Sequence, residues 1–312
     1  MIFFIFFSSI LFLVYSYVAW KFIWLLNFSI LYKTIFTLII AVLYLLTIFS
    51  FIFYFNKIEN QFTYIITWIG YIGLGLISLL FFIHIAIDLI LVINNIFIDK
   101  NKFDPKRRAF IQLSLKGVAG VIGLMGTSWG LYTATKTPII KKVKIPIKNL
   151  PKSLSKIRMV QITDLHVSTL ITNTFVEKVV KKIIKIEPDI LFFTGDAADG
   201  TVKSFGKYLN PLGKIKPKYG KYFVTGNHEY YSDMNGWLNH IESLGFKILI
   251  NESQNITIND STIMLTGIPD RTGKYFSNFH KTDMKKALNG MPNSDLKILL
   301  AHQPKDIEYA TK

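Results

Sequence analysis

Four short clusters of polar residues each follow an apolar run in the second half of the chain. They are Asp164-Leu-His166, Gly195-Asp196-Ala-Ala-Asp199-Gly200, Gly226-Asn227-His228-Glu229 and Ala301-His302-Gln303-Pro304. Ligands of α/β sheets gather at the carboxyl ends of strands, so we expect the four clusters to meet in one cleft. Asp164 and Asp196, with one asparagine and three histidines, would reach that cleft.

The donor types in these clusters indicate a metal site with two ions. Carboxylate, amide and imidazole ligands without sulfur suit Mn, Fe, Zn or Mg, and the chain contains no cysteine. Two aspartates with several histidines exceed the needs of one ion. A carboxylate such as Asp196 can bridge two cations about 3.5–4 Å apart, which positions a phosphoryl group and generates hydroxide at neutral pH. The predicted chemistry is phosphoester hydrolysis.

The four clusters differ in how much they indicate. Asp-x-His occurs by chance in many proteins, and Gly-Asp is common in turns, so either alone is more often structural. Gly226-Asn227-His228-Glu229 directly after a strand is more informative, because glycine permits a tight turn and the next two residues place an amide oxygen beside an imidazole. All four clusters in this order favour a functional site.

The elements that must position these clusters alternate between strand and helix from residue 156 onward. Short apolar runs predict strands, and apolar residues at helical spacing predict helices. The predicted strands are 157–162, 190–193, 222–225, 247–250, 256–258, 262–267 and 297–300, and the predicted helices are 174–186 and 236–244. This alternation predicts an α/β domain whose sheets are covered by helices.

From about residue 157 to the end, the chain resembles the calcineurin-like metallophosphoesterase family, specifically its membrane-anchored bacterial branch. The resemblance implies a two-sheet αββα sandwich as the C-terminal fold. It also implies two divalent metal ions, most often Mn, Fe or Zn. Asp164 and His166 look like ligands of the first metal, Asp196 like the bridge, and Asn227 and His302 like ligands of the second.

The resemblance implies a catalytic role for His228, which would stabilise the charge that develops on the phosphate or on the leaving oxygen. The family pattern also has a Gly-His-x-His element downstream of His302, with one ligand for each metal. The sequence up to Lys312 does not contain it, and neither His240 nor His280 has a matching context. The expectation is a fragment of a longer protein, or a naturally shortened copy whose activity is open.

The first half of the chain predicts a membrane domain. Of the 36 basic and 20 acidic residues, only 14 and 4 precede position 151, and 51% of the whole chain is hydrophobic. This composition excludes a purely soluble protein, a disordered one and a disulfide scaffold. Uncharged or nearly uncharged runs predict about four transmembrane helices, because a span needs about 20 apolar residues. The predicted helices are about 2–20, 34–55, 63–97 and 109–133. The predicted domains are a membrane domain 1–135, a basic tether 136–155 and the metallophosphoesterase domain 156–312.

The basic residues of the short loops predict the orientation. The break between the third and fourth helices holds five basic residues, whereas the preceding loop holds Lys57 with Glu59. The positive-inside rule then predicts a multi-pass protein of the cytoplasmic membrane with an extracytoplasmic catalytic domain. Five lysines between positions 136 and 148 favour the inverse, cytoplasmic arrangement. The run from Lys106 to Gly117 resembles a twin-arginine export signal, although a basic cytoplasmic stop explains it equally well.

Three functions are compatible with these patterns. The first is a membrane-anchored two-metal phosphohydrolase that cleaves a phosphomonoester, a phosphodiester or a lipid-linked pyrophosphate. The second is a catalytically inactive membrane protein whose remnant domain binds a phosphorylated ligand or partner. The third, a transporter or channel built on the four helices, depends only on His84 and Asp88 within the third helix. The expected partners are a phosphorylated small-molecule or lipid substrate and membrane lipids. Nucleic acid is not expected, because most of the excess positive charge flanks membrane segments.

Overall fold

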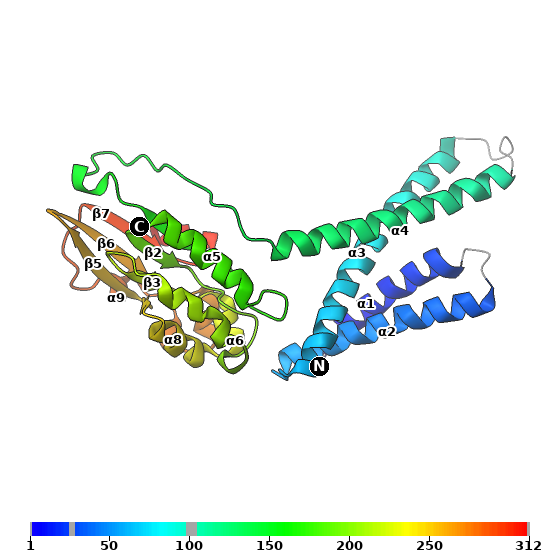
Figure 1. The fold of residues 1–312 in the computed structure, drawn as a ribbon, viewed down its shortest axis with the longest axis horizontal. Helices are drawn as coiled ribbons and strands as arrows, with labels where there is room; N and C mark the ends of the chain where they lie inside the picture. The colour runs from blue at the N-terminus through cyan, green and yellow to red at the C-terminus, as the bar shows by residue number, and fades with distance from the viewer. Residues whose placement is uncertain (1, 25–28, 98–104, 311–312) are drawn as a thin grey trace. The chain divides into compact units, whose positions relative to one another are not determined.

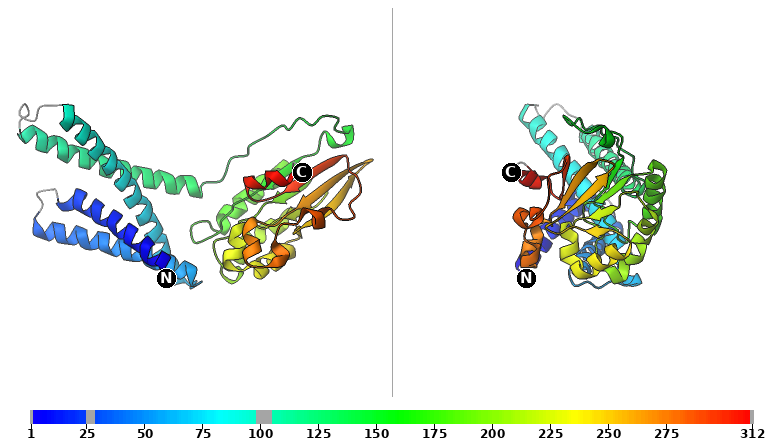
Figure 2. Two further views of the ribbon diagram at one scale, coloured as in Figure 1. Left: turned by 180° about the vertical axis from the view of Figure 1, so that it is seen from behind. Right: turned by 90° about the vertical axis from the view of Figure 1, so that its left-hand side faces the viewer.

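The computed structural model describes residues 2–24, 29–97 and 105–310 of the chain. It divides into two compact units, Met1–Lys136 and Thr137–Lys312 (Figure 1, Figure 2). Residues 98–104, which belong to the basic loop used to predict the orientation, lie outside the described residues.

The secondary-structure elements in the described residues of the first unit are all helices. Its elements are α1 (Ile2–Ala19), the π-helix η1 (Trp20–Trp24), α2 (Ile30–Phe55), α3 (Gln61–Phe97) and α4 (Pro105–Thr135). Three described segments are long and apolar enough to cross a membrane: Phe4–Ile23, Ile30–Phe55 and Gln61–Ile93. The α4 helix is also continuous but less apolar, so its crossing of the membrane remains a prediction.

The two ionisable residues of α3 have structural partners. Asp88 accepts hydrogen bonds from the Tyr17 hydroxyl and from Lys21 Nζ, both at 2.7 Å. His84 Nδ1 lies 2.8 Å from the Leu80 carbonyl oxygen one turn earlier in the same helix. Asp88 is half-buried, and Lys21 supplies both an opposite charge and a hydrogen bond to it. Asp88 therefore joins α3 to the N-terminal helix, as expected for a structural group.

The second unit contains an all-parallel sheet in the order β1-β2-β3-β4. Its strands are β1 (Met159–Ile162), β2 (Ile190–Phe193), β3 (Lys221–Phe223) and β4 (Lys247–Ile248). All four residues of β2 are buried, as expected for a parallel strand covered on both faces. The helices α5 (Asn173–Ile186), α6 (Val202–Leu209) and α8 (Met234–Ser243) pack beside one another along this sheet (Figure 1).

A second, mixed sheet has the order β5-β6-β7. The strands β5 (Glu252–Ile258) and β6 (Ser261–Gly267) form an antiparallel hairpin, and β7 (Leu296–Leu300) pairs with β6 in parallel. The two sheets share one hydrophobic core, whose buried residues are Leu154, Ile190, Phe192, Tyr222, Val224, Leu249, Ile256, Ile258, Ile263, Leu265 and Leu300. The short helices α7 (Asn227–Ser232), α9 (Met284–Leu288) and α10 (Ile307–Ala310) complete the unit.

The α/β character of this unit is as predicted, whereas several element boundaries differ. The β5 strand begins at Glu252, four residues before the predicted start, because its first half is polar and lacks an apolar signal. The predicted strand 247–250 is only two residues long. The α6, α7 and α9 helices were not predicted, since each has fewer than nine residues and too few turns for a clear helical period. The helical layer expected outside the second sheet remains a prediction, although α9 contacts β5 and β6.

Candidate metal centre

The polar clusters lie on loops at the carboxyl ends of four strands. In the first sheet, Ile162, Phe193 and Phe223 are register partners at the ends of β1, β2 and β3, so the loops that follow begin at one edge. The cluster residues are Asp164 and His166 after β1, Asp196 and Asp199 after β2, Asn227 and His228 at the start of α7 after β3, and His302 after β7. For the first three clusters, the predicted convergence follows from the parallel arrangement of β1, β2 and β3, whereas His302 comes from the second sheet.

Three of the cluster residues have left-handed backbone conformations. The φ angles are 52° at Asp164, 45° at His166 and 56° at Asp196. This region is uncommon for residues other than glycine, and it persists only where the surroundings enforce it. Here the two loops enforce it on each other, because Asp164 N donates to the Gly195 carbonyl and His166 N donates to the Asp196 carbonyl, both at 3.1 Å. Three predicted metal ligands therefore have backbone conformations that their neighbours enforce.

The third cluster approaches the second so closely that only glycine fits at position 226. A Cβ atom placed there would lie 2.1 Å from Asp196 Oδ1 and 2.6 Å from the Asp196 backbone nitrogen. The adjacent His228 N donates to the same Oδ1 at 2.9 Å. Asp196 is therefore fixed by one oxygen against the start of α7, which leaves Oδ2 for other partners.

Two histidines meet at this second oxygen. His302 Nε2 lies 3.3 Å and His166 Nε2 lies 3.5 Å from Asp196 Oδ2, and His166 Nε2 is also 3.7 Å from Asp164 Oδ1. Ligand atoms about 2.1 Å from one ion at tetrahedral or octahedral angles lie roughly 3.0–3.4 Å apart. The observed separations are close to this range and longer than normal hydrogen bonds. Asp164, Asp196 and His302 form a group whose donor atoms could hold a metal ion.

The other ring nitrogen of each histidine has an acceptor behind it. His302 Nδ1 donates to the Thr194 carbonyl at 2.7 Å, and His166 Nδ1 donates to Asp199 Oδ1 at 2.7 Å. An outer acceptor of this kind sets the tautomer so that Nε2 carries the lone pair toward the ion. With Nδ1 held in this way, both imidazoles would present Nε2 to an ion once the ring is neutral.

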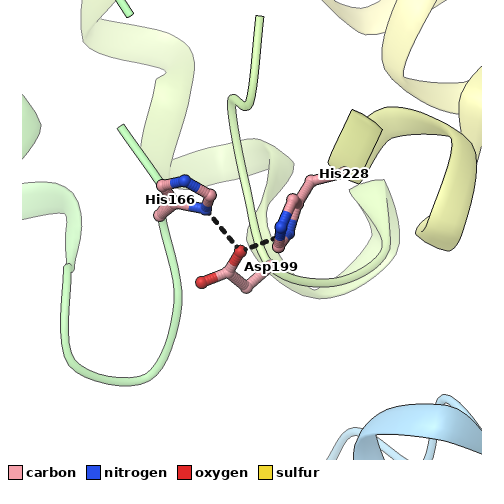
Figure 3. A group of neighbouring side chains, drawn as sticks. All are labelled: His166, Asp199 and His228. Carbon is pink, nitrogen blue, oxygen red and sulfur yellow. Dashed lines mark hydrogen bonds and ion pairs between the residues drawn. The ribbon is translucent and has the colours of Figure 1, made fainter. Parts of the chain in front are cut away.

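Asp199 lies between two imidazole rings (Figure 3). The same oxygen, Oδ1, is 2.7 Å from His166 Nδ1 and 2.8 Å from His228 Nδ1, and the two rings are 4.6 Å apart edge to face. These three residues could also hold an ion. However, separations of 2.7–2.8 Å are typical of charge-assisted contacts and shorter than the spacing of ligands on one ion. We therefore interpret Asp199 as an orienting carboxylate.

The charges of the cluster shift several pKa values. Burial raises the pKa of the Asp199 carboxyl, but its interactions with His166 and His228 outweigh burial and lower this pKa to about 2. Burial lowers the pKa of His302, but the Asp196 carboxylate and the Thr194 carbonyl outweigh burial and raise this pKa to about 9. The contact with Asp199 raises the pKa of His228. Before any cation binds, the site therefore favours protonated imidazoles beside ionised carboxylates.

Glu229 joins two of the motif loops from a fully buried position. Its carboxylate accepts backbone N–H groups from Gly226 and Ala197 at 2.7 Å and from Asp196 at 3.1 Å. Burial raises the pKa of this carboxyl despite these hydrogen bonds. Because the donors come from both loops, Glu229 fixes the position of Asp196 relative to α7.

The structure brings Asp164, His166, Asp196 and His302 together and places His228 beside them. Asn227 is the first residue of α7, next to His228. Within the described residues, its side chain makes no hydrogen bond with the other predicted ligands. The two remaining histidines of this unit lie elsewhere, with His240 Nε2 2.8 Å from the Gly206 carbonyl oxygen and His280 Nδ1 2.7 Å from the Tyr230 hydroxyl.

Asp199 and Glu229 were missed as contributors to the site. Both stand inside the polar clusters that follow the strands, Asp199 three residues after Asp196 and Glu229 two residues after Asn227. In the sequence, the only indication that these residues contribute to the site is that each is a carboxylate close to a predicted ligand. Neither position indicates a partner by itself, because the left-handed turns that aim Asp199 at His166 are visible only in the structure.

Comparison with known proteins identifies the second unit. A family model described as calcineurin-like phosphoesterase matches residues 157–311. The chain is 35% identical over 181 residues to a Danio rerio protein named "Transmembrane protein with metallophosphoesterase domain", with 56% of this chain and 41% of that protein covered. It is 30% identical over 185 residues to an uncharacterized metallophosphoesterase of Aquifex aeolicus, with 59% of this chain and 69% of that protein covered.

A shorter match has a more specific name. It joins the chain to the UDP-2,3-diacylglucosamine pyrophosphatase LpxG of Chlamydia muridarum, with 35% identity over 100 residues and 30% of each chain covered. The chain thus spans less than half the length of the Danio rerio and Chlamydia relatives. The transmembrane relative and the three apolar helices support association with a membrane. The chain belongs to the calcineurin-like phosphoesterase family.

Proposed function

We propose that this chain is a membrane-anchored, two-metal phosphohydrolase. The observation that carries the proposal is the meeting of His166 Nε2 and His302 Nε2 at one oxygen of Asp196, at separations of 3.5 and 3.3 Å. A carboxylate approached by imidazoles of two different loops is suited to bridge two ions. Asp164 and His166 would hold the first ion, and Asn227 and His302 would hold the second.

Two divalent ions would supply an activated hydroxide and neutralise charge on the phosphoryl oxygens. The protein would supply their positions. Asp199 and the Thr194 carbonyl hold His166 and His302 by Nδ1, and Glu229 holds the loop of Asp196. Mn, Fe and Zn all accept these nitrogen and oxygen donors.

His228 would act on the leaving group. Its Nδ1 faces Asp199, so Nε2 is the nitrogen that can reach a substrate. The raised pKa of His228 favours the protonated ring at neutral pH. A proton on Nε2 can be given to the departing oxygen, and the carboxylate of Asp199 stabilises the charged ring until then.

A phosphorylated lipid is the substrate class that we favour among phosphomonoesters, phosphodiesters and lipid-linked pyrophosphates. The apolar helices of the same chain keep the catalytic domain close to a bilayer, and the Chlamydia muridarum relative is named as a pyrophosphatase of a diacylated sugar nucleotide. We place the domain on the extracytoplasmic side of the cytoplasmic membrane, from the basic loop before α4, with the cytoplasmic side as the alternative.

The test is Mn²⁺-stimulated hydrolysis of an aryl phosphodiester by the purified chain and by Asp196→Asn. The matched control is Asp260→Asn, the same chemical change at an exposed turn residue between β5 and β6. We expect turnover in the wild type and in the control, and none above background in Asp196→Asn. Equal background rates in all three proteins would reject the enzyme and favour the alternative, an inactive domain that binds a phosphorylated ligand.

A further inference from the structure

A segment between β6 and β7 exposes aromatic side chains to solvent. The exposed fractions are 77% for Tyr275, 54% for Phe276 and 80% for Phe279, and Leu288 is 40% exposed. Single exposed apolar residues are normal, but several large rings within five positions form an apolar patch that indicates a binding surface. We call residues 274–288 together with Tyr231 the aromatic–basic surface.

Hydrogen bonds to the body of the domain hold this surface in place. Asn251 is buried, and its Nδ2 donates to the Lys281 carbonyl at 2.8 Å while its Oδ1 accepts from Asp283 N at 2.8 Å. His280 Nδ1 is 2.7 Å from the Tyr230 hydroxyl, and Tyr230 is buried. The rings on either side of these anchors are therefore exposed from a fixed backbone.

The charges around the rings are almost all positive. Lys274, Lys281, Lys285 and Lys286 are exposed on this surface. Its one acidic residue, Asp283, already accepts from Lys286 N at 3.0 Å as the N-cap of α9. Lys274 Nζ lies 4.8 Å from the centre of the Tyr275 ring. Aromatic rings among lysines are the composition by which proteins bind the interface of an anionic bilayer.

The aromatic–basic surface begins next to the metal centre. The His228 and Tyr231 rings are 5.7 Å apart, and the Tyr231 and Phe276 rings are 6.4 Å apart. Phe276 also lies 5.8 Å from the ring of Tyr230, which belongs to the same helix, α7. The rings of Tyr231 and Phe276 therefore connect His228, the proposed proton donor, to the exposed surface. A partner that covers this surface lies next to the metal centre.

We propose that the aromatic–basic surface binds an anionic lipid bilayer, with Tyr275, Phe276 and Phe279 inserted at the level of the headgroups. The same chain has three segments able to span a bilayer, so this partner is always within reach of the domain. The lysines complement anionic headgroups, whereas a protein interface is usually depleted in lysine. The proposal is independent of catalysis and goes beyond the function proposed above.

Site-specific fluorescence tests this contact, and the absence of cysteine from the chain makes single labelling possible. The full chain carrying Phe279→Cys is labelled with an environment-sensitive fluorophore and reconstituted into vesicles that contain phosphatidylglycerol and doxyl-labelled lipid. Asp260→Cys is the control, because Asp260 is exposed at the start of β6, at the opposite end of the strand from this surface. Both substitutions replace exposed side chains, so folding is preserved.

We expect blue-shifted emission and at least twofold quenching by the doxyl lipid for the label at 279, and neither effect at 260. Quenching at 279 should fall in 1 M salt, and also when Lys285→Glu and Lys286→Glu are combined, because both changes weaken attraction to anionic lipid. Equal quenching at 279 and 260, or no quenching at 279, would overturn the proposal. A blue shift at 279 without doxyl quenching would also overturn it, because another protein surface would then cover the patch.

Discussion

Replacing Gly226 by alanine should disrupt the metal centre through a single methyl group. The new Cβ would lie 2.1 Å from Asp196 Oδ1, 2.6 Å from Asp196 N and 2.8 Å from Asp196 Cγ. Ordinary contacts of a Cβ atom are 3.4 Å or longer, so the new Cβ would be more than 1 Å too close to Asp196 Oδ1 and would also clash with Asp196 N and Cγ. The backbone of Gly226 itself, at φ −95° and ψ −171°, is open to alanine. The effect is therefore one of packing.

The displaced group has no free direction in which to move. Asp196 N is bonded to Glu229, Asp196 Oδ1 to His228 N, and Asp196 Oδ2 faces the two imidazoles. A misplacement of about 1 Å in a catalytic constellation can cost about 100-fold in rate. Overpacking of this kind costs typically 1–3 kcal/mol of stability. We expect kcat/KM to fall at least about 100-fold while the domain still folds.

The assay is the Mn²⁺-dependent hydrolysis of an aryl phosphodiester, with thermal unfolding in detergent measured on the same samples. Gly213→Ala is the matched control, because its Cβ would meet nothing closer than Leu244 Cδ2 at 3.7 Å. A Gly226→Ala protein with a rate within threefold of wild type would refute the close packing of Asp196 against α7 as a requirement of the site.

Three further predictions follow from particular contacts. Asp199→Asn should lower kcat about 100-fold or more while the metal content stays within twofold of wild type. The reason is that the Asp199 carboxylate orients two imidazoles and supports the protonated His228 ring. Kinetics and elemental analysis of the same sample check both expectations. Glu229→Ala should leave three buried backbone N–H donors without an acceptor. At about 1–3 kcal/mol for each donor, the free energy of unfolding should fall by several kcal/mol, which the shift of the thermal midpoint measures. Burial lowers the pKa of Lys221 to about 8 from 10.5. Between these two pH values the unfolded state still holds the Lys221 proton and the native state has lost it, so the free energy of unfolding should rise with pH. Chemical unfolding of Lys221→Met over the same pH range should not show this rise.

The positions of the chemistry-bearing residues could be predicted from the sequence because they depend on a simple rule. Asp164, Asp196 and His228 each follow a short apolar run, and the carboxyl ends of parallel strands share one edge. His302 was harder, since β7 belongs to the other sheet and pairs with a strand about 30 residues earlier. Its approach to Asp196 depends on the packing of two sheets, for which the sequence holds no local signal.

The orientation of the side chains was beyond sequence reasoning. Asp196 and His166, on the two loops that bring Asp199 to His166, both have left-handed conformations. Asp and His adopt this region more often than most residues, but neither residue type indicates it at a particular position. The polar first half of β5 was missed for a related reason, since Glu252 to Asn255 gain their strand conformation from pairing with β6 and not from their own hydrophobicity. Tertiary contacts decided both cases.

The proposed chemistry depends above all on one carboxylate shared by two ions. Elemental analysis of the full chain after reconstitution with Mn²⁺ and removal of free metal measures the number of bound ions directly. We expect about two ions per chain for the wild type and for Asp260→Asn, and at most one for Asp196→Asn, because both ions lose the same ligand. An Asp196→Asn protein that keeps the wild-type number of ions, or a wild type that binds none, would contradict the shared site.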